Sequence, residues 1–438
     1  MSQYKPYPAY KDSGVEWLGR VPEHWDVLSF QRCVSIAEGQ VNPEQSPYSE
    51  MTLIAPNHLE SGTGRVLYSE TAAEQNAESG KYLCQSGDVV YSKIRPALRK
   101  VCIAEERSLC SADMYPMRGH SGMNNGFLFW FLLSEPFSAF AVLEADRVAM
   151  PKINRESLNA VQLPRPQLAE QQAITSRLDR ETARIDALIE KKTRFIELLR
   201  EKRQALITHA VTKGLDPNVK MKDSGVEWLG EVPEHWEVRS VSSVSTKITN
   251  GYVGPTRDIL VEEGVRYLQS LHIKGNQIKF DVPYFVTEEW SNQHRKSILE
   301  TGDVLIVQTG DIGQVTVVTD EFAGCNCHAL IIVAPERSII AGEWMSWVFN
   351  SSYGYHTLLS IQTGAMHPHL NCGNVKDVFL PVPPLTEQRE IMKHIEHEER
   401  RVAALVGKTE RSIELLKERR SALITAAVTG QIDLREAV

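Results

Sequence analysis

Two stretches of the chain carry apolar residues in steps of three, four or seven, which is the spacing of a heptad seam on a long helix. Each stretch begins after a proline-rich segment and fades near a glycine, Gly214 or Gly430, of the kind that caps a helix. A shift of 217 residues superimposes the second seam on the first, with one weak position at Ser412. The seam positions are Ile174, Leu178, Ile185, Leu188, Phe195, Leu199 and Leu206, and Ile391, Ile395, Val402, Leu405, Leu416 and Leu423.

These seams predict two helices of roughly 40 residues, about 60 Å long at 1.5 Å per residue. A helix of this length needs an equally long partner to bury its apolar stripe. The other copy is the obvious partner, because pairing about a pseudo-twofold axis buries equivalent surfaces on both. The alternative is that each helix packs only on its own domain.

Two shorter patterns predict elements between the helices. The segments Asp88–Lys93 and Asp303–Gln308 are rich in β-branched and aromatic residues, and each follows a Gly-Asp turn, so both are expected to be strands. The run Phe127–Leu133 is continuously apolar but far shorter than the roughly 20 residues that span a bilayer. A buried helix is the favoured interpretation of this run.

The patterned elements belong to a long internal repeat. Lys11–Trp25 returns as Lys222–Trp236 with a single difference, Arg20 against Glu231, and Leu163–Gln171 resembles Leu380–Gln388. A third similarity sets Met150–Asn154 against Met366–Asn371. Between the markers lie two divergent bodies, Ser29 to Gln162 and Ser240 to Phe379. Fixed ends around divergent middles predict one scaffold that carries two different readers.

Composition fits an ordinary globular protein of two large domains. The chain has 438 residues, of which 42% are apolar and 24% charged. Its formal net charge of -8 argues against a simple basic nucleic-acid binder. Locally, however, the segment Tyr91–Ile103 holds four cations, Lys93, Arg95, Arg99 and Lys100, without an acid. Such a run is often only a solvated face, but the second body also has a basic stretch, from Val265 to Phe280.

Candidate chemistry is scarce. The seven scattered cysteines suit a reducing compartment, and no signal peptide is visible, so we expect a cytoplasmic protein. The cluster Cys325-Asn326-Cys327-His328, with His367, His369 and Cys372, lacks the paired C-x-x-C of a zinc site, so we expect no bound metal. We find no phosphate loop, dinucleotide motif, nucleophile elbow or metalloprotease motif. The chain is therefore predicted to be a non-catalytic binder.

Taken in order, the duplicated Val-Pro-Glu-His-Trp segments, the Gly-Asp strands and the Pro-flanked Glu-Gln helix starts resemble the specificity subunit of type I restriction-modification systems over essentially the whole chain. The resemblance implies an α+β fold of two target-recognition domains, residues 1–162 and 216–379. Two long helical regions, residues 163–215 and 380–438, would join them as an antiparallel coiled coil. Each domain would read one half of a split DNA site.

The resemblance also implies partners and cofactors. Two modification subunits would use S-adenosylmethionine to methylate adenine in double-stranded DNA, and restriction subunits would use ATP and Mg²⁺ to cleave it. These cofactors belong to the partners, so none is expected in this chain. Two alternatives are a stand-alone restriction or methylation enzyme, which would need motifs the chain lacks, and a scaffold that binds only protein.

Nine residues are candidates for DNA contact because their side chains suit phosphates or base edges. The first body contributes the four cations of its basic run, and the second contributes mixed donors and acceptors near its shared strand. The candidates are Lys93, Arg95, Arg99, Lys100, Gln269, His272, Lys274, Gln308 and Thr309.

Overall fold

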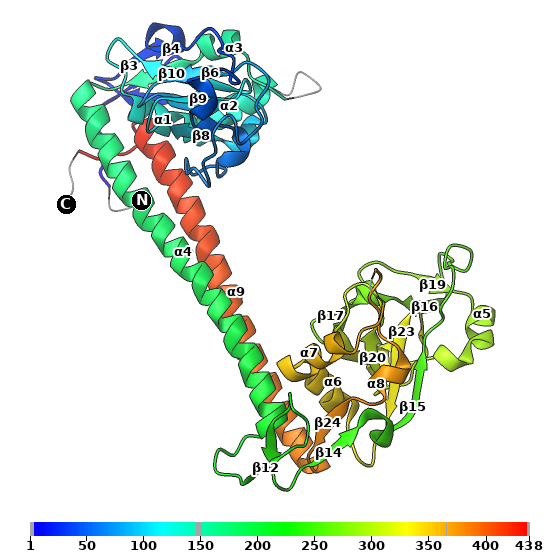
Figure 1. The fold of residues 1–438 in the computed structure, drawn as a ribbon. Coiled ribbons are helices and arrows are strands. Elements are labelled where there is room, and N and C mark those ends of the chain that lie inside the picture. Colours follow the sequence, from blue (N-terminus) through cyan, green and yellow to red (C-terminus); the bar gives the residue numbers. More distant parts are fainter. Residues whose placement is uncertain (1–3, 146–150, 365, 436–438) are drawn as a thin grey trace. The chain divides into compact units, whose positions relative to one another are not determined.

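A computed structural model describes residues 4–145, 151–364 and 366–435. The chain forms two compact units (Figure 1). Unit 1 consists of residues 1–193 and 410–438, and unit 2 consists of residues 194–409. Each unit therefore contains one body and a part of both long helices. Met150, which begins one of the repeated segments, lies outside the described residues.

Unit 1 holds the first body. Its strands are β1 (Tyr10–Asp12), β2 (Arg20–Pro22), β3 (Asp26–Ser29), β4 (Val34–Ile36), β5 (Leu53–Ile54), β6 (Tyr82–Cys84), β7 (Val89–Ser92), β8 (Val101–Ile103), β9 (Ser108–Cys110), β10 (Met114–Gly119) and β11 (Gln162–Arg165). Its helices are α1 (Asn125–Leu133), α2 (Glu135–Ala145), α3 (Arg155–Ala160) and the start of α4 (Leu168–Lys213).

Unit 2 holds the second body. Its strands are β12 (Met221–Asp223), β13 (Glu231–Pro233), β14 (Glu237–Ser240), β15 (Ser245–Asn250), β16 (Val265–Leu268), β17 (Ile273–Lys274), β18 (Gln277–Ile278), β19 (Phe285–Val286), β20 (Val304–Val307), β21 (Val315–Val317), β22 (Asn326–Cys327), β23 (Leu330–Pro335) and β24 (Phe379–Val382). Its helices are α5 (Glu288–Gln293), α6 (Gly342–Asn350), α7 (Ser352–Ser360), α8 (Cys372–Val375) and the start of α9 (Leu385–Val428).

The two bodies share one framework. Each has a four-stranded antiparallel sheet, in the order β4-β10-β7-β8 in unit 1 and β15-β23-β20-β21 in unit 2. The predicted Gly-Asp strands are confirmed as β7 and β20, which lie inside these sheets. Their entry turns place Gly87 and Gly302 at φ +85° and +89°, a region that disfavours other residues. A smaller three-stranded sheet completes each body.

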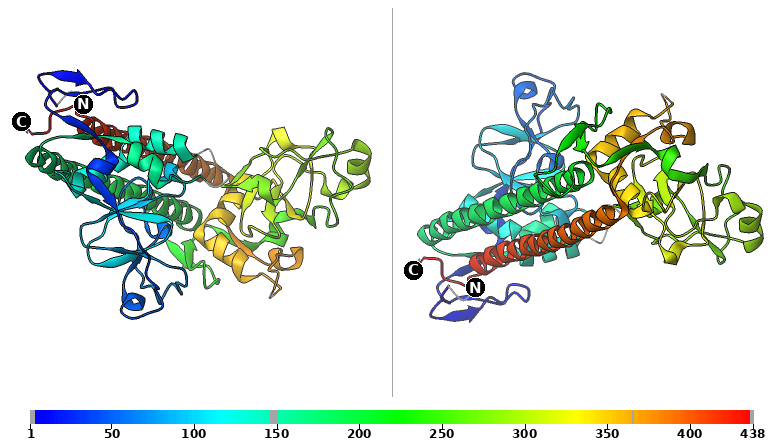
Figure 2. Two further views of the ribbon diagram at one scale, coloured as in Figure 1. Left: turned by 90° about the horizontal axis from the view of Figure 1, so that it is seen from above. Right: turned by 90° about the horizontal axis from the view of Figure 1, so that it is seen from below.

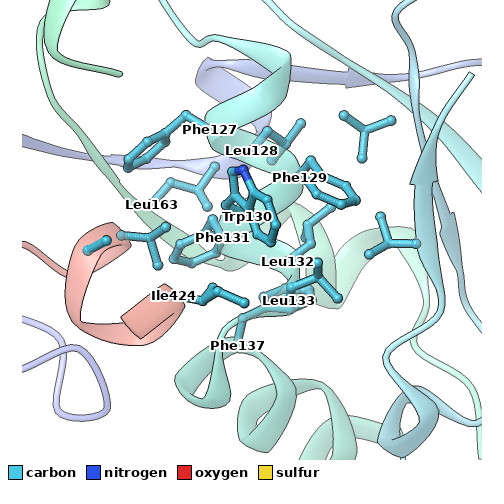
Figure 3. Packing of buried hydrophobic residues seen from close by; sticks show 14 of the residues in the cluster. Phe127, Leu128, Phe129, Trp130, Phe131, Leu132, Leu133, Phe137, Leu163 and Ile424 are labelled. Atoms are coloured by element: carbon cyan, nitrogen blue, oxygen red, sulfur yellow. The ribbon is translucent and has the colours of Figure 1, made fainter. Parts of the chain in front are cut away.

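The apolar run of the first body is confirmed as the buried helix α1. All seven residues from Phe127 to Leu133 are buried, and Ile424 of α9 packs against the same cluster (Figure 3). Within the described residues, no single helix is long and apolar enough to cross a membrane. Only α1 and α2 taken together reach that length and composition, and they are bent by 66° at the break between them.

Both ends of each body meet in a short ladder. Strands β3 and β11 pair antiparallel so that Ser29 lies opposite Gln162, and β14 and β24 pair so that Ser240 lies opposite Phe379. These four residues are the first and last of the two divergent bodies. Each body is thus a closed excursion from one hydrogen-bonded pair of strands.

The repeated motifs bind each other through a glutamate at each helix start. In unit 1, Glu170 accepts hydrogen bonds from the Trp25 indole (3.1 Å) and the Tyr7 hydroxyl (2.8 Å), and the His24 ring lies 2.9 Å from its second oxygen. In unit 2, Glu387 accepts from Trp236 (3.0 Å), and the His235 ring lies 2.7 Å away. We call each arrangement the glutamate lock.

The glutamine that follows each glutamate is fully buried and satisfies loop backbone. Gln171 donates to the carbonyls of Gly122 and Pro166 and accepts from the Asn124 amide. Gln388 donates to Ile339 and Pro383 and accepts from Ala341 in the same pattern. The Glu-Gln pair thus fixes the helix start to its own body from two sides.

The long helices are confirmed and lie side by side (Figure 2). They contain 46 and 44 residues and end just before Gly214 and Gly430, both at positive φ. Ion pairs join Arg420 to Asp186 within unit 1 and Arg203 to Glu399 within unit 2. Because the residue number rises along one helix as its partner's falls, the pairing is antiparallel.

The predicted seam is wrong in the middle of both helices. Leu188, Phe195 and Leu405 are 41%, 44% and 39% exposed. Burial passes instead from Ile185 to Ile196, a step of 11 residues. Eleven residues in three turns match a straight helix better than a strict heptad does, since heptad positions drift by about 20° per repeat. The buried stripe therefore moves off the heptad positions.

Removing the carboxylate of the glutamate lock should destabilise unit 1 more than unit 2. Glu170→Ala leaves two buried donors, Trp25 and Tyr7, without an acceptor, which we expect to cost about 3 kcal/mol. Glu387→Ala strands one such donor at a more exposed site, so a loss of about 1–2 kcal/mol is expected. Urea unfolding followed by tryptophan fluorescence measures both. Equal losses, or a larger loss for Glu387→Ala, would contradict this ranking.

Candidate nucleic-acid interface

The turn after the Gly-Asp strand of unit 1 lies beside the segment that precedes α3. The Ile153 amide donates to the Lys93 carbonyl (2.9 Å), and the Arg95 amide donates to the Pro151 carbonyl (3.0 Å). We call residues 93–100 together with 151–154 the paired-loop surface of unit 1. Sequence segments that looked like separate similarities are thus neighbours in space.

Four cations gather at one side of this surface. The side chains of Arg95 and Lys152 are exposed, and Arg95 makes no side-chain hydrogen bond or ion pair among the described residues. The Lys93 ammonium and the Arg155 guanidinium each lie 5.2 Å from the centroid of the Tyr115 ring. Lys152 and Arg155 were not predicted as site residues. Their signal in the sequence is the repeated segment next to them.

The other two predicted cations of this body have internal partners. Arg99 forms an ion pair with Glu135 at 2.7 Å, and its backbone is left-handed at φ +46°. Lys100 donates to the Pro56 carbonyl at 2.6 Å. Both remain candidates for DNA contact, but any such contact would compete with these bonds.

Unit 2 builds the equivalent surface from different residues. The Leu370 amide donates to the Gln308 carbonyl (2.9 Å), as Ile153 does to Lys93, and Thr309 pairs with His369. We call residues 308–314 together with 363–370, apart from residue 365, which is not described, the paired-loop surface of unit 2. It presents hydroxyl, amide and imidazole groups rather than a cluster of cations.

Two side chains of this second surface are poised for contact. The Gln308 amide oxygen is buried and has no hydrogen-bond partner among the described residues. Met366 is 88% exposed. Neither Met366 nor His369 was predicted as a site residue, although both lie in the repeated segment before α8.

The remaining predicted residues lie on the hairpin β17–β18 and the turn before it. His272 is fully buried; its ring accepts from the Gln269 amide (2.8 Å) and lies 2.8 Å from the Val282 carbonyl. Burial lowers the pKa of His272, so the neutral ring is favoured. Gln269 shares this cap, while Lys274 is exposed. Of the three, Lys274 is the side chain most available to a partner.

No cluster of three or more His, Cys, Asp or Glu side chains in the described parts of the chain is placed to hold a metal. Cys325 and Cys327 are buried, and burial raises the pKa of the Cys325 thiol to about 11. Burial also lowers the pKa of His328. These groups form part of the core of unit 2.

Comparison with known families decides the assignment. A family model described as the type I restriction modification DNA specificity domain matches the chain twice, over residues 42–198 and 233–415. Each match covers most of one body and part of the long helix that follows. The chain belongs to this family of type I specificity proteins.

Relatives within the specificity family support the duplication. The chain is 32% identical to the EcoDI specificity subunit of Escherichia coli over 208 residues, which are 47% of this chain and 46% of that protein. It thus spans about half the length of that relative. Over 433 residues it is 22% identical to the putative MjaX specificity subunit of Methanocaldococcus jannaschii, covering 95% of this chain and 96% of the relative.

Solved structures share the fold. A chain solved in work on complex assembly and conformational transition of the type I R-M system has a TM-score of 0.73 at 18% identity, covering 94% of this chain and 99% of that chain. The HsdS subunit from Thermoanaerobacter tengcongensis has a TM-score of 0.56 at 18% identity, covering 94% and 98%. The predicted α+β fold with two repeated domains and two long antiparallel helices is therefore confirmed, as is the specificity-family resemblance.

The buried histidines predict an acid-sensitive fold. Burial lowers the pKa of His58 and of His272 below the ordinary value of about 6.5. The unfolded chain therefore binds protons more readily, and the stability present above about pH 6.5 is lost as the pH falls. Urea midpoints at pH 7.5 and 5 should differ less for His272→Gln than for the wild type. The exposed control His120→Gln should keep the wild-type difference, and an equal difference in all three proteins would refute this role for His272.

Proposed function

We propose that the chain is the non-catalytic DNA-reading subunit of a type I restriction-modification complex and that each body reads one half of a split site. The observation that carries this proposal is the pair of paired-loop surfaces. Both are built at the same place on one framework, by the same backbone bond from Ile153 to Lys93 and from Leu370 to Gln308. Their side chains differ, as two readers of different sequences require.

The chemistry of the first surface suits phosphates and guanine. Arg95 and Lys152 are exposed on adjacent segments that join through the bridge between Ile94 and Lys152. Lysine and arginine neutralise backbone phosphates, and arginine also reads the O6 and N7 atoms of guanine. Lys93 and Arg155, held against Tyr115, add positive potential beside them.

The chemistry of the second surface suits base edges. An amide such as that of Gln308 can pair with the N6 and N7 atoms of adenine, and its buried oxygen has no partner of its own. The exposed thioether of Met366 offers an apolar contact of the kind that thymine methyl groups accept. The surface therefore favours reading of bases over phosphate neutralisation.

Partners complete the proposed complex. A net charge of -8 leaves much of the phosphate neutralisation to the modification and restriction subunits, which also carry S-adenosylmethionine, ATP and Mg²⁺. The long helices expose leucines at repeat-equivalent positions, Leu188 and Leu198 on α4 and Leu405 and Leu415 on α9. Two copies of one modification subunit could each use the same contact.

A pair of arginine variants tests the first surface. In the complex assembled with its modification subunits, Arg95→Ala should weaken DNA binding by about 1 kcal/mol and lower the salt slope by about one. Arg99→Ala, which breaks the ion pair with Glu135, should leave that slope unchanged. Affinity measured at several salt concentrations separates the two. If Arg95→Ala binds DNA with wild-type affinity and slope, Arg95 does not face DNA.

A body exchange tests the independence of the two readers. Because Ser240 and Phe379 lie opposite each other in one ladder, residues 240–379 can be replaced by the corresponding body of a relative without moving the joins. The hybrid complex should methylate a site in which one half is new and the other is retained. Mapping of methylated adenines measures this. A change in both halves would show that the bodies do not read independently.

A further inference from the structure

Unit 2 contains a cavity of about 360 Å³ that is within the size range of ligand pockets. Its walls come from the helix α4, the turns after β17 and β20, and the helices α6 and α7. Residues Arg203, Gly275, Gly313, Trp347, Asn350 and Tyr355 are among those that line it. None of the proposed DNA contacts uses this cavity.

The corresponding place in unit 1 can be identified from matching bonds. The Glu135 amide donates to the Thr425 hydroxyl in unit 1, and the Ser352 amide donates to the Thr208 hydroxyl in unit 2. Both pairs of residues are 217 apart, as are Trp130 and Trp347, and Arg420 and Arg203. Arg420 and Trp130 are therefore the unit 1 counterparts of two cavity walls.

In unit 1 a hairpin of the chain itself occupies this place. Arg420 donates to the backbone carbonyls of Gly62 (2.9 Å) and Thr63 (3.0 Å), and its guanidinium lies 5.8 Å from the Trp130 ring centroid. At Gly64 a Cβ atom would lie 2.3 Å from the Phe129 ring, so the hairpin packs tightly against α1. Arg420 thus recognises an uncharged, glycine-rich turn by its carbonyl oxygens.

Two local differences empty the place in unit 2. After the buried His58 the unit 1 hairpin has four residues between its paired positions, 60 and 65, whereas after His272 the unit 2 hairpin has only Gly275 and Asn276. In addition, Arg99, which in unit 1 reaches across to Glu135 and Ser421, is matched by Gly313. The match follows from the next residue, because Lys100 and Gln314 make the same backbone bond to their own neighbouring strands.

The cavity keeps polar groups but little net charge. The Arg203 guanidinium donates through Nε to Glu399 at 2.6 Å, and the ion pair neutralises it. The Trp347 indole makes no hydrogen bond within the described part of the chain, whereas its counterpart Trp130 donates to Asp179. A neutral lining with free donors favours backbone carbonyls over phosphates.

We propose that this cavity receives an uncharged, glycine-containing turn of a partner subunit, which takes the place that residues 61–64 occupy in unit 1. The proposal rests on the proposed function, because it requires the assembled complex. It assigns the second unit a protein contact that the first unit makes within its own chain. The complex would then carry this contact at only one of its two bodies.

Site-specific crosslinking in the full complex tests the proposal. A photoreactive p-benzoylphenylalanine replaces Tyr355, which lines the cavity, or the matched control Ser138 of unit 1. Light should join position 355 to a short turn of a partner subunit, identified by mass spectrometry, and position 138 only to this chain. Crosslinks from position 355 to DNA or to a second copy of this chain, or none at all, would overturn the proposal.

A loop graft supplies the second arm. Replacing Gly275-Asn276 by Ser-Gly-Thr-Gly, the turn of unit 1, should fill the cavity, remove the crosslink and weaken assembly with the partner at least tenfold. Ser352→Trp fills the same space without changing the backbone and should act likewise if the graft fails to fold. Unchanged assembly of a folded filled variant would refute the proposal. Split-site methylation, scored separately, would still report on the proposed function.

Discussion

Everything that the two units share depends on a buried carboxylate at the start of each long helix. Glu170 collects the Trp25 indole and the Tyr7 hydroxyl beside the His24 ring, and Glu387 collects the Trp236 indole beside the His235 ring. A buried carboxylate needs these partners, and the donors need the carboxylate. The two motifs of each repeat are therefore constrained together, although a whole divergent body separates them in the chain.

The same motifs also receive the end of the opposite helix. A Cβ atom at Gly430, after α9, would lie 2.2 Å from Pro22, and one at Gly214, after α4, would lie 3.3 Å from the Trp236 ring. Each tryptophan motif thus holds the start of one long helix and the end of the other. This arrangement explains why the fixed residues gather at the helix ends and why the bodies are free to differ.

Much of the fold could be predicted because its signals are local. The capping glycines at 214 and 430, the Gly-Asp turns at 87 and 302 and the apolar run of α1 each act through the backbone or through burial of neighbouring residues. The exposed Leu188 and Phe195 could not be predicted, because the buried face of a long helix drifts away from a strict heptad. Only the partner helix decides which stripe is covered.

The candidate site shows the limit more clearly. Arg95 and Arg99 look alike in sequence, yet Arg99 reaches Glu135 while Arg95 is exposed, because the turn between them aims them differently. His272 looks like a reader, but its ring closes a cap. Lys152 and Arg155 complete the basic surface from a segment some 50 residues away, and no local pattern joins that segment to Lys93.

The central claim is that two bodies on one framework read two halves of one DNA site. It is tested most directly by mapping methylated adenines in the DNA of cells that express this chain with its modification subunits. The account predicts a single split sequence, with two specific halves at a fixed separation and unspecified bases between them. A continuous recognition sequence, or halves at variable separation, would contradict it.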